Sequence, residues 1–278
     1  MNAGAVLLPF AAWASGVPEG LIAAIERRTG GRLGVAALRT RSGRWIRHRA
    51  DERFAMCSTF KLLVAAAVLH RVDRGEEQLD RWIRYGKNDL LEYAPVAQAS
   101  LDKGGMTVSR MAEAAVEDSD NTCANLLLES LGGPPGMTAY ARALGDPVTR
   151  LDRTEPQLNT AVAGDPRDTT TPQAMLDDLR RLVLGDALSK ASRTLLTGWL
   201  AGCHTAAARI PAGLPAGWKS GNKTGTGANG TTNDVAIIWP PGRTPILLSV
   251  YFTGSTIGPV AREAVIADVS RIVSRAFS

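Results

Sequence analysis

The chain has 278 residues, 45% of them hydrophobic and 21% charged, which is typical of a globular protein and excludes a disordered or fibrous one. The formal net charge of +5 is small for this length, and the basic pairs Arg27-Arg28 and Arg180-Arg181 stand beside acidic residues, so a nucleic-acid binder is excluded. No stretch reaches the roughly 18 apolar residues that a membrane-spanning helix needs.

A short apolar run opens the chain. Residues 5–14 end in Ala12-Trp13-Ala14, which fits the small-x-small cleavage pattern of a secretory signal, although the basic residues that normally precede such a run are missing. We therefore predict that residues 1–14 are a partial signal segment, cleaved after Ala14, and that the protein is periplasmic or secreted. The alternative is a weakly packed N-terminal tail.

The next elements follow from hydrophobic periodicity. Residues 17–29 have the spacing of an amphipathic helix, and residues 33–39 and 44–49 are expected strands joined by a tight turn. Residues 58–71 are apolar on every side, which is typical of a buried helix. Almost everything from there to about residue 202 is expected to be helical, with clear helices at 107–118, 121–131, from 171 onward, and at 190–202.

Strands return near the C-terminus. Residues 223–227, 234–239 and 245–252 are expected strands, and 259–277 is an amphipathic helix. The fold class is therefore α/β (α+β): an antiparallel five-stranded sheet, flanked by N- and C-terminal helices, with an inserted all-helical lobe. We place the α/β lobe at 15–56 and 203–278 and the helical lobe at 57–202, as one functional domain with its active site in the groove between them.

Ser58-Thr59-Phe60-Lys61 places a serine and a lysine one helical turn apart on the same face. A serine hydroxyl is a weak nucleophile unless a base takes its proton, and a lysine amine serves as that base only where burial or positive charge lowers its pKa. The apolar residues after Lys61 provide such burial. By itself the pattern also fits a capping serine and a solvated lysine.

Two further motifs contain groups that would contact a substrate. In Ser119-Asp120-Asn121, Ser119 could relay a proton and Asn121 could bind an amide, although the motif also fits a helix C-cap and turn. Lys223-Thr224-Gly225 and Thr226 would bind a carboxylate on an exposed strand edge; the alternative is an edge strand protected by its lysine. The N–H groups of Ser58 and Thr226 could form an oxyanion hole.

Residues 150–170 are polar, contain two prolines and predict a long ordered loop, a kind of segment that is usually functional. Glu155 and Asn159 could together orient and deprotonate one water. Arg153 and Asp168 could hold the loop by an ion pair. The alternative is a solvated surface loop.

In this order the four motifs resemble those of the class A serine β-lactamases. Residues 85–95, 148–153 and 167–172 also resemble family segments, so the resemblance covers nearly everything after residue 15. It implies hydrolysis of the β-lactam ring of penicillins and cephalosporins through a serine acyl-enzyme, conferring antibiotic resistance. It also implies small-molecule β-lactam substrates, no cofactor, and a monomer.

The resemblance also implies a role for each motif residue. Ser58 is acylated, with Lys61, or Glu155 acting through a water, as the acylation base. Glu155 and Asn159 drive deacylation, and the Glu155-Pro156 bond is expected in cis. The other expected roles are protonation of the ring nitrogen by Ser119, contact with the substrate amide by Asn121, binding of the substrate carboxylate by Lys223, Thr224 and Thr226, and lining of the cleft mouth by Tyr93.

Two departures from the family pattern stand out. Many members have an arginine on the strand after Lys-Thr-Gly, where this chain has Thr231-Thr232-Asn233; we expect Arg209 to replace it. Some members bridge the cysteine before the nucleophile to a second cysteine, but the partner position of Cys57 is Gly227, so that bridge cannot form. Cys57, Thr226 and Arg209 together resemble the broad-spectrum branches.

The three cysteines (Cys57, Cys123, Cys203) suit free thiols, although one bridge stays open. The three histidines (His48, His70, His204) have no ligand spacing, so no metal site is expected. The nearest alternative function is a penicillin-binding D,D-peptidase, which lacks the Glu155 and Asn159 arrangement. A signalling receptor would need an anchor or partner domain, and a serine esterase would need a histidine base.

Overall fold

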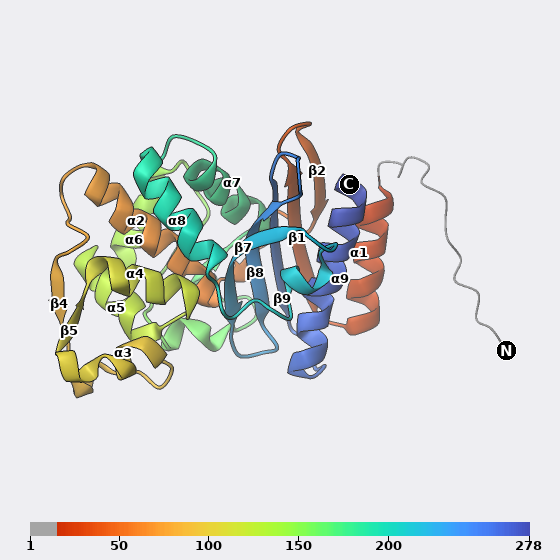
Figure 1. Ribbon diagram of the computed structural model, residues 1–278. Coiled ribbons are helices and arrows are strands. Elements are labelled where there is room, and N and C mark those ends of the chain that lie inside the picture. The colour runs from red at the N-terminus through yellow and green to blue at the C-terminus, as the bar shows by residue number, and fades with distance from the viewer. Residues whose placement is uncertain (1–15) are drawn as a thin grey trace.

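Five strands form one antiparallel sheet in the order β2-β1-β9-β8-β7 (Figure 1). The computed structural model describes residues 16–278, so the predicted signal segment, residues 1–14, lies outside the described residues. The predicted fold class is confirmed. The strands are β1 (Arg32–Arg39), β2 (Arg44–His48), β7 (Lys219–Thr226), β8 (Thr232–Trp239) and β9 (Ile246–Thr253).

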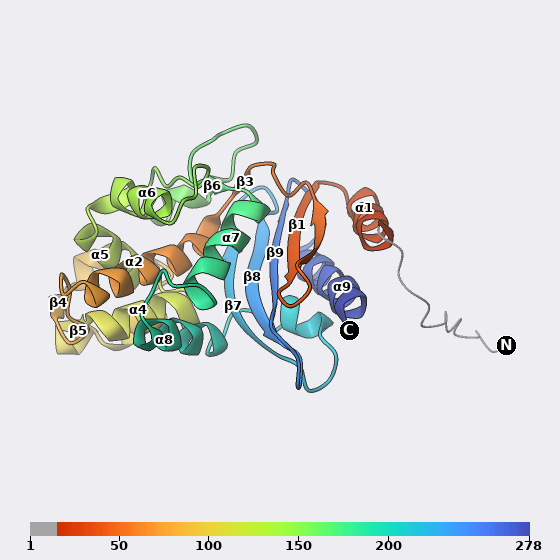
Figure 2. The same ribbon diagram turned by 90° about the horizontal axis from the view of Figure 1, so that it is seen from above.

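Helices cover both faces of this sheet. The terminal helices α1 (Val17–Thr29) and α9 (Pro259–Phe277) lie on one face, and α7 (Pro172–Val183) and α8 (Lys190–Ala201) lie on the other (Figure 2). The rest of the helical part contains α2 (Lys61–Asp73), α3 (Pro95–Ala99), α4 (Val108–Glu117), α5 (Asn121–Ser130) and α6 (Gly133–Ala143). The lobe boundaries at residues 57 and 202 remain predictions.

The sheet separates two hydrophobic cores. Successive side chains of a strand point to opposite faces, so Leu247 and Tyr251 of β9 pack with the helical part while Leu248 and Phe252 pack with α1 and α9. Because both faces are covered, β9 is buried along nearly its whole length. The helix predicted to be apolar all round is α2, whose residues 61–69 are buried in the middle of the helical part.

The structure contains elements that the sequence pattern did not predict. The Gly-Gly-Pro-Pro run that follows the helix predicted at 121–131 begins a further helix, α6, because proline fits the first turn of a helix, where its missing N–H is not needed. Two ladders, β3 (Phe54–Ala55) with β6 (Thr169–Thr170) and β4 (Trp82–Arg84) with β5 (Gly105–Thr107), are too short for periodicity to reveal.

Two buried aspartates meet where α6 and α7 lie close to the start of the long loop. Asp178 of α7 is fully buried, and Asp146, which follows α6, contacts its side chain. The Oδ2 atom of each has no hydrogen-bond partner among the described residues. Burial, and then the charge of Asp146, raise the pKa of Asp178 to about 9. Asp178 therefore keeps its proton at neutral pH.

We expect Asp178→Asn to raise the Tm at pH 8, by roughly 2–4 °C for each kcal/mol gained. The native state keeps a proton that the unfolded chain releases above the ordinary aspartate pKa of 3.8, so the folding penalty grows from about pH 4 to about pH 9. Asparagine does not titrate, so its advantage should shrink toward pH 4. Thermal unfolding at several pH values, with Asp177→Asn as the control on the same helix, checks this; an advantage independent of pH contradicts it.

Candidate active site

Ser58 lies in a single 3₁₀ turn, Cys57–Phe60, that leads directly into the buried helix α2. Its hydroxyl donates a hydrogen bond to Glu155 Oε1 at 2.9 Å. These two residues are 97 positions apart in the chain. The contact therefore brings the expected nucleophile together with the expected carboxylate of the long loop.

Lys61 is the first residue of α2 and is fully buried. Its Nζ lies 3.0 Å from the same Glu155 Oε1, and it donates to Ser119 O at 2.8 Å and to Asn121 Oδ1. Burial lowers the pKa of Lys61, and the Glu155 carboxylate opposes that shift. The Ser58 hydroxyl donates to Glu155, whereas Lys61 meets Ser58 through its backbone N–H, which donates to Ser58 O. Glu155 Oε1 therefore contacts both the Ser58 hydroxyl and the Lys61 amine.

Ser119 stands between two lysine amines. Its hydroxyl accepts from Lys223 Nζ at 3.0 Å and from Lys61 Nζ at 3.4 Å. Burial, and then the charge of Lys61, lower the pKa of Lys223 to about 7. Two amines of lowered pKa on either side of one hydroxyl form a chain along which a proton can pass.

The turn that contains Ser119 is held by Asp120, a residue to which the sequence analysis gave no role. The Asp120 carboxylate caps α5 by accepting from Cys123 N at 2.9 Å, and it also accepts from Val96 N and Ala97 N at the start of α3. The spacing of Asp120 and Cys123 is that of a helix N-cap, so this part of its function could have been predicted. Its bonds to α3 could not have been predicted, because they join residues 23 and 24 positions apart.

Strand β7 runs along the opposite side of the site. A Cβ atom on Gly225 would lie 2.7 Å from Met56 O, so the glycine lets the strand edge approach the turn that holds Ser58. Lys223 and Thr224, which lie just before it, are buried and not exposed as expected. Thr205, which we did not predict, meets Thr224 through their hydroxyls at 2.5 Å.

Arg209 is only 6% exposed and lies behind the end of β7. It donates to Gly225 O at 3.0 Å, to Asn233 O at 2.8 Å, and to Thr226 Oγ1 at 2.7 Å. Glu263 of α9 pairs with its Nε at 3.3 Å. A guanidinium therefore lies against the predicted carboxylate-binding threonine.

Tyr93, also predicted to line the site, is half-exposed, and its carbonyl accepts from Asn121 N.

Glu155 is 2% exposed, and the peptide bond to Pro156 is cis, as predicted. Asn125, which was not predicted, holds the backbone of Glu155. Its side-chain oxygen accepts from Glu155 N, and its side-chain amide donates to Glu155 O. Asn159 donates its amide to Glu155 Oε2, while its buried Oδ1 has no partner among the described residues. This acceptor and the adjacent carboxylate suit a water held between them.

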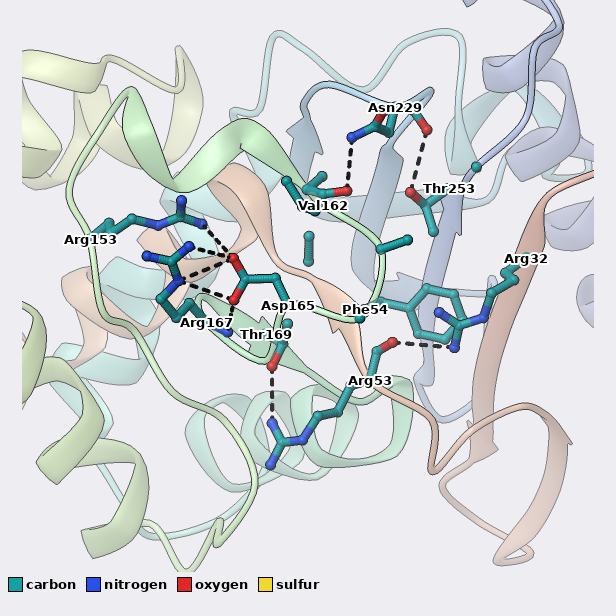
Figure 3. Close-up of a pocket in the computed structure, with 15 residues that line it drawn as sticks. Arg32, Arg53, Phe54, Arg153, Val162, Asp165, Arg167, Thr169, Asn229 and Thr253 are labelled. Carbon is teal, nitrogen blue, oxygen red and sulfur yellow. Dashed lines mark hydrogen bonds and ion pairs between the residues drawn. The ribbon is translucent and has the colours of Figure 1, made fainter.

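The long loop is tied to the rest of the site by charge and by backbone bonds. Arg153 Nε lies 2.6 Å from Asp168 Oδ2, and Asp168 O accepts from Met56 N two residues before Ser58. Arg153 also approaches Asp165, which pairs with Arg167; Figure 3 shows both arginines beside this carboxylate. The loop that holds Glu155 is thereby fixed relative to the nucleophile.

Cys57, Cys123 and Cys203 are free thiols. A Cβ atom on Gly227 would lie 2.6 Å from Cys57 Sγ and 2.7 Å from Asn159 O. Any side chain at position 227 would therefore push on the loop at Asn159 as well as on the thiol. Glycine at this position allows the loop to pack closely against β7.

One possible metal-ligand group lies in the described part of the chain outside the predicted site. Glu117, Asp118 and His204 place their ligand atoms within 4.8 Å of one another, although the histidine spacing did not suggest it. None of the contacts described for Ser58, Lys61 and Glu155 involves this group.

Among the helices of residues 16–278, none is both long and apolar enough to cross a membrane.

Comparisons with known proteins show which family the chain resembles over its length. The model of the β-lactamase enzyme family matches residues 19–277. The chain is 48% identical to β-lactamase CTX-M-25 of Escherichia coli over 97% of this chain and 92% of that protein, and 47% identical to β-lactamase Toho-1 of the same species over 91% and 87%. An ancestral class A β-lactamase structure superposes with a TM-score of 0.91 at 60% identity, covering 92% of this chain and 98% of that one.

Proposed function

Because the chain belongs to the class A β-lactamases, a family of hydrolases, we propose that it opens the β-lactam ring of penicillins and cephalosporins through an ester on Ser58. The observation that carries this proposal is the contact of Ser58 and Lys61 with one oxygen of Glu155. Purified protein should hydrolyse nitrocefin, and a Ser58→Ala variant should not. Wild-type protein that leaves both nitrocefin and penicillin intact would overturn the proposal.

Acylation begins when Ser58 Oγ attacks the lactam carbonyl carbon. Its proton passes to Glu155 or to Lys61, whose pKa is lowered by burial. The N–H groups of Ser58 and Thr226 stabilise the oxyanion, and removing one such donor typically costs about 10²–10³ in turnover. The carbon–nitrogen bond then breaks, and Ser119 gives its proton to the ring nitrogen and is reprotonated through the lysines beside it.

Deacylation uses a water held by Glu155 and Asn159. The water oxygen attacks the ester carbon while its proton passes to Glu155, and the proton returns to Ser58 Oγ as the carbon–oxygen bond breaks. The unpartnered Asn159 Oδ1 and its amide bond to Glu155 support this position for the water. In this way the enzyme regains its free hydroxyl after each turnover.

Lys223, Thr224 and Thr226 bind the substrate carboxylate, Asn121 contacts the substrate amide, and Tyr93 lines the mouth. Arg209 supplies the positive charge behind Thr226. We expect Arg209→Gln to raise the KM for a carboxylate-bearing substrate about tenfold, because a charge-assisted bond is replaced by a neutral one. Steady-state kinetics check this, with the methyl ester of the same substrate as control; an equal loss for acid and ester contradicts the role.

Substrate range, location and assembly complete the proposal. Cys57, Thr226 and Arg209 support a broad-spectrum enzyme, since they resemble the broad-spectrum branches of the family. A panel of penicillins and cephalosporins checks the range, and turnover confined to penicillins contradicts it. We also propose an exported, monomeric enzyme whose mature form lacks residues 1–14; intact mass of the secreted protein tests the cleavage.

A further inference from the structure

A pocket of about 110 Å³ opens beside the long loop, and its lining includes none of Ser58, Lys61 or Glu155. One wall is formed by loop residues 161–165 and Arg167, and the others by Arg32 of β1, residues 53–55 around β3, and residues 253–254 at the end of β9. We call this the loop pocket (Figure 3). It is bounded by both the loop and the sheet, so a ligand there would contact both.

The middle of the loop pocket is apolar. Phe54, Ala55, Ala161, Val162 and Ala163 line it; Val162 is 55% exposed, whereas Phe54 is 2% exposed and the Arg32 guanidinium lies over its ring at 4.5 Å. In Figure 3 the Phe54 ring and Val162 lie between the arginines on either side. A cavity of about 150 Å³ holds a benzene molecule, so this slightly smaller but open pocket has room for most of an aromatic ring.

The charged lining of the loop pocket is mostly positive. It has four arginines and one carboxylate, Asp165. Arg153 and Arg167 share Asp165, and Arg32 pairs with Glu52 beside the pocket. Arg53 donates only to neutral oxygens, Val148 O and Thr169 Oγ1 at 3.0 Å each, and within residues 16–278 no carboxylate lies within salt-bridge distance of it. Its charge is left for an anion.

We propose that the loop pocket is a second binding site, which takes a small aromatic carboxylate with its ring between Val162 and Ala55 and its carboxylate toward Arg53. Asn229, another lining residue, already joins the two walls by donating to Thr160 O and Ala161 O of the loop. A ligand between the walls would add apolar and charged contacts to these hydrogen bonds. Binding therefore stabilises the long loop in its packed position against the sheet. The same loop holds Glu155 and Asn159.

Benzoate, with benzamide as its neutral isostere, is the probe. At this ligand size a Kd on the order of 1 mM is expected. In amide-resolved NMR without any β-lactam, benzoate should shift the signals of Ala163 and Gly164 and raise the Tm, while benzamide at the same concentration should do neither. Sodium chloride at matched ionic strength separates binding from salt screening.

Arg53→Gln should weaken benzoate binding about tenfold, since it removes the charge from the anchoring bond. Arg243→Gln, a change in the exposed turn between β8 and β9, should leave it unchanged. The proposal is overturned if 20 mM benzoate shifts no loop signal, if benzamide binds equally well, or if Arg53→Gln binds benzoate as tightly as the wild type does. None of these outcomes depends on turnover, so the site and the hydrolase function fail or stand separately.

Discussion

Glu155→Ala is expected to leave Ser58 covalently acylated and to lower steady-state turnover of nitrocefin by about 10²–10⁴-fold, the usual contribution of a general base. The reason is geometric, because Glu155 Oε2 accepts from the Asn159 amide beside Asn159 Oδ1, which has no partner in residues 16–278 and would bind the attacking water. Without this carboxylate, ring opening is faster than hydrolysis of the ester, so the acyl-enzyme accumulates. Intact mass taken seconds after mixing should show one substrate added to Ser58.

Glu129→Ala is the matched control, since it removes an exposed carboxylate from α5 without touching the loop. It should keep wild-type turnover and show no adduct. Unchanged turnover in Glu155→Ala would remove this residue from the mechanism. A wild-type protein that itself accumulates the adduct would instead favour the penicillin-binding D,D-peptidase.

The sheet and the buried helix were predictable because each depends on a local pattern. β9 and α2 are apolar through most of their length, and that pattern requires cover on all sides whatever surrounds them. The caps at Thr107 and Thr171 are equally local, since each hydroxyl accepts from an N–H three residues on. Such elements follow from neighbouring residues alone.

The arrangement of the site does not follow from local pattern. Asn125 holds the backbone of Glu155 from 30 residues away, and Ser58 meets Glu155 from 97 away. No periodicity links such positions; the family resemblance brought together Ser58 and Glu155 but not Asn125. The bond from Ser58 to Glu155 Oε1, rather than to Lys61, also depends on where the loop packs against β7 at Gly227.

Substitution of Lys61 distinguishes the two candidate acylation bases, Lys61 and Glu155. We expect Lys61→Met to slow acylation of Ser58 by about 10²–10⁴-fold, because burial lowers the pKa of the amine and so favours its proton-accepting form, whereas methionine has no group that accepts a proton. Lys61→Met should therefore not form the covalent adduct that accumulates in Glu155→Ala. Stopped-flow acylation with nitrocefin, followed by mass spectrometry of the quenched protein, measures both quantities.

Stability needs a separate control, because Lys61 is the buried cation beside Glu155 and removing one partner of such a pair typically costs about 3–5 kcal/mol. Lys61→Arg keeps the charge but cannot accept a proton, so it should lose acylation as fully as Lys61→Met while retaining more of the Tm. If both variants acylate at the wild-type rate and fail only in deacylation, Glu155 alone takes the proton of Ser58. In that case the direct bond from Ser58 to Glu155 is the acylating contact, and Lys61 serves to hold the carboxylate in place.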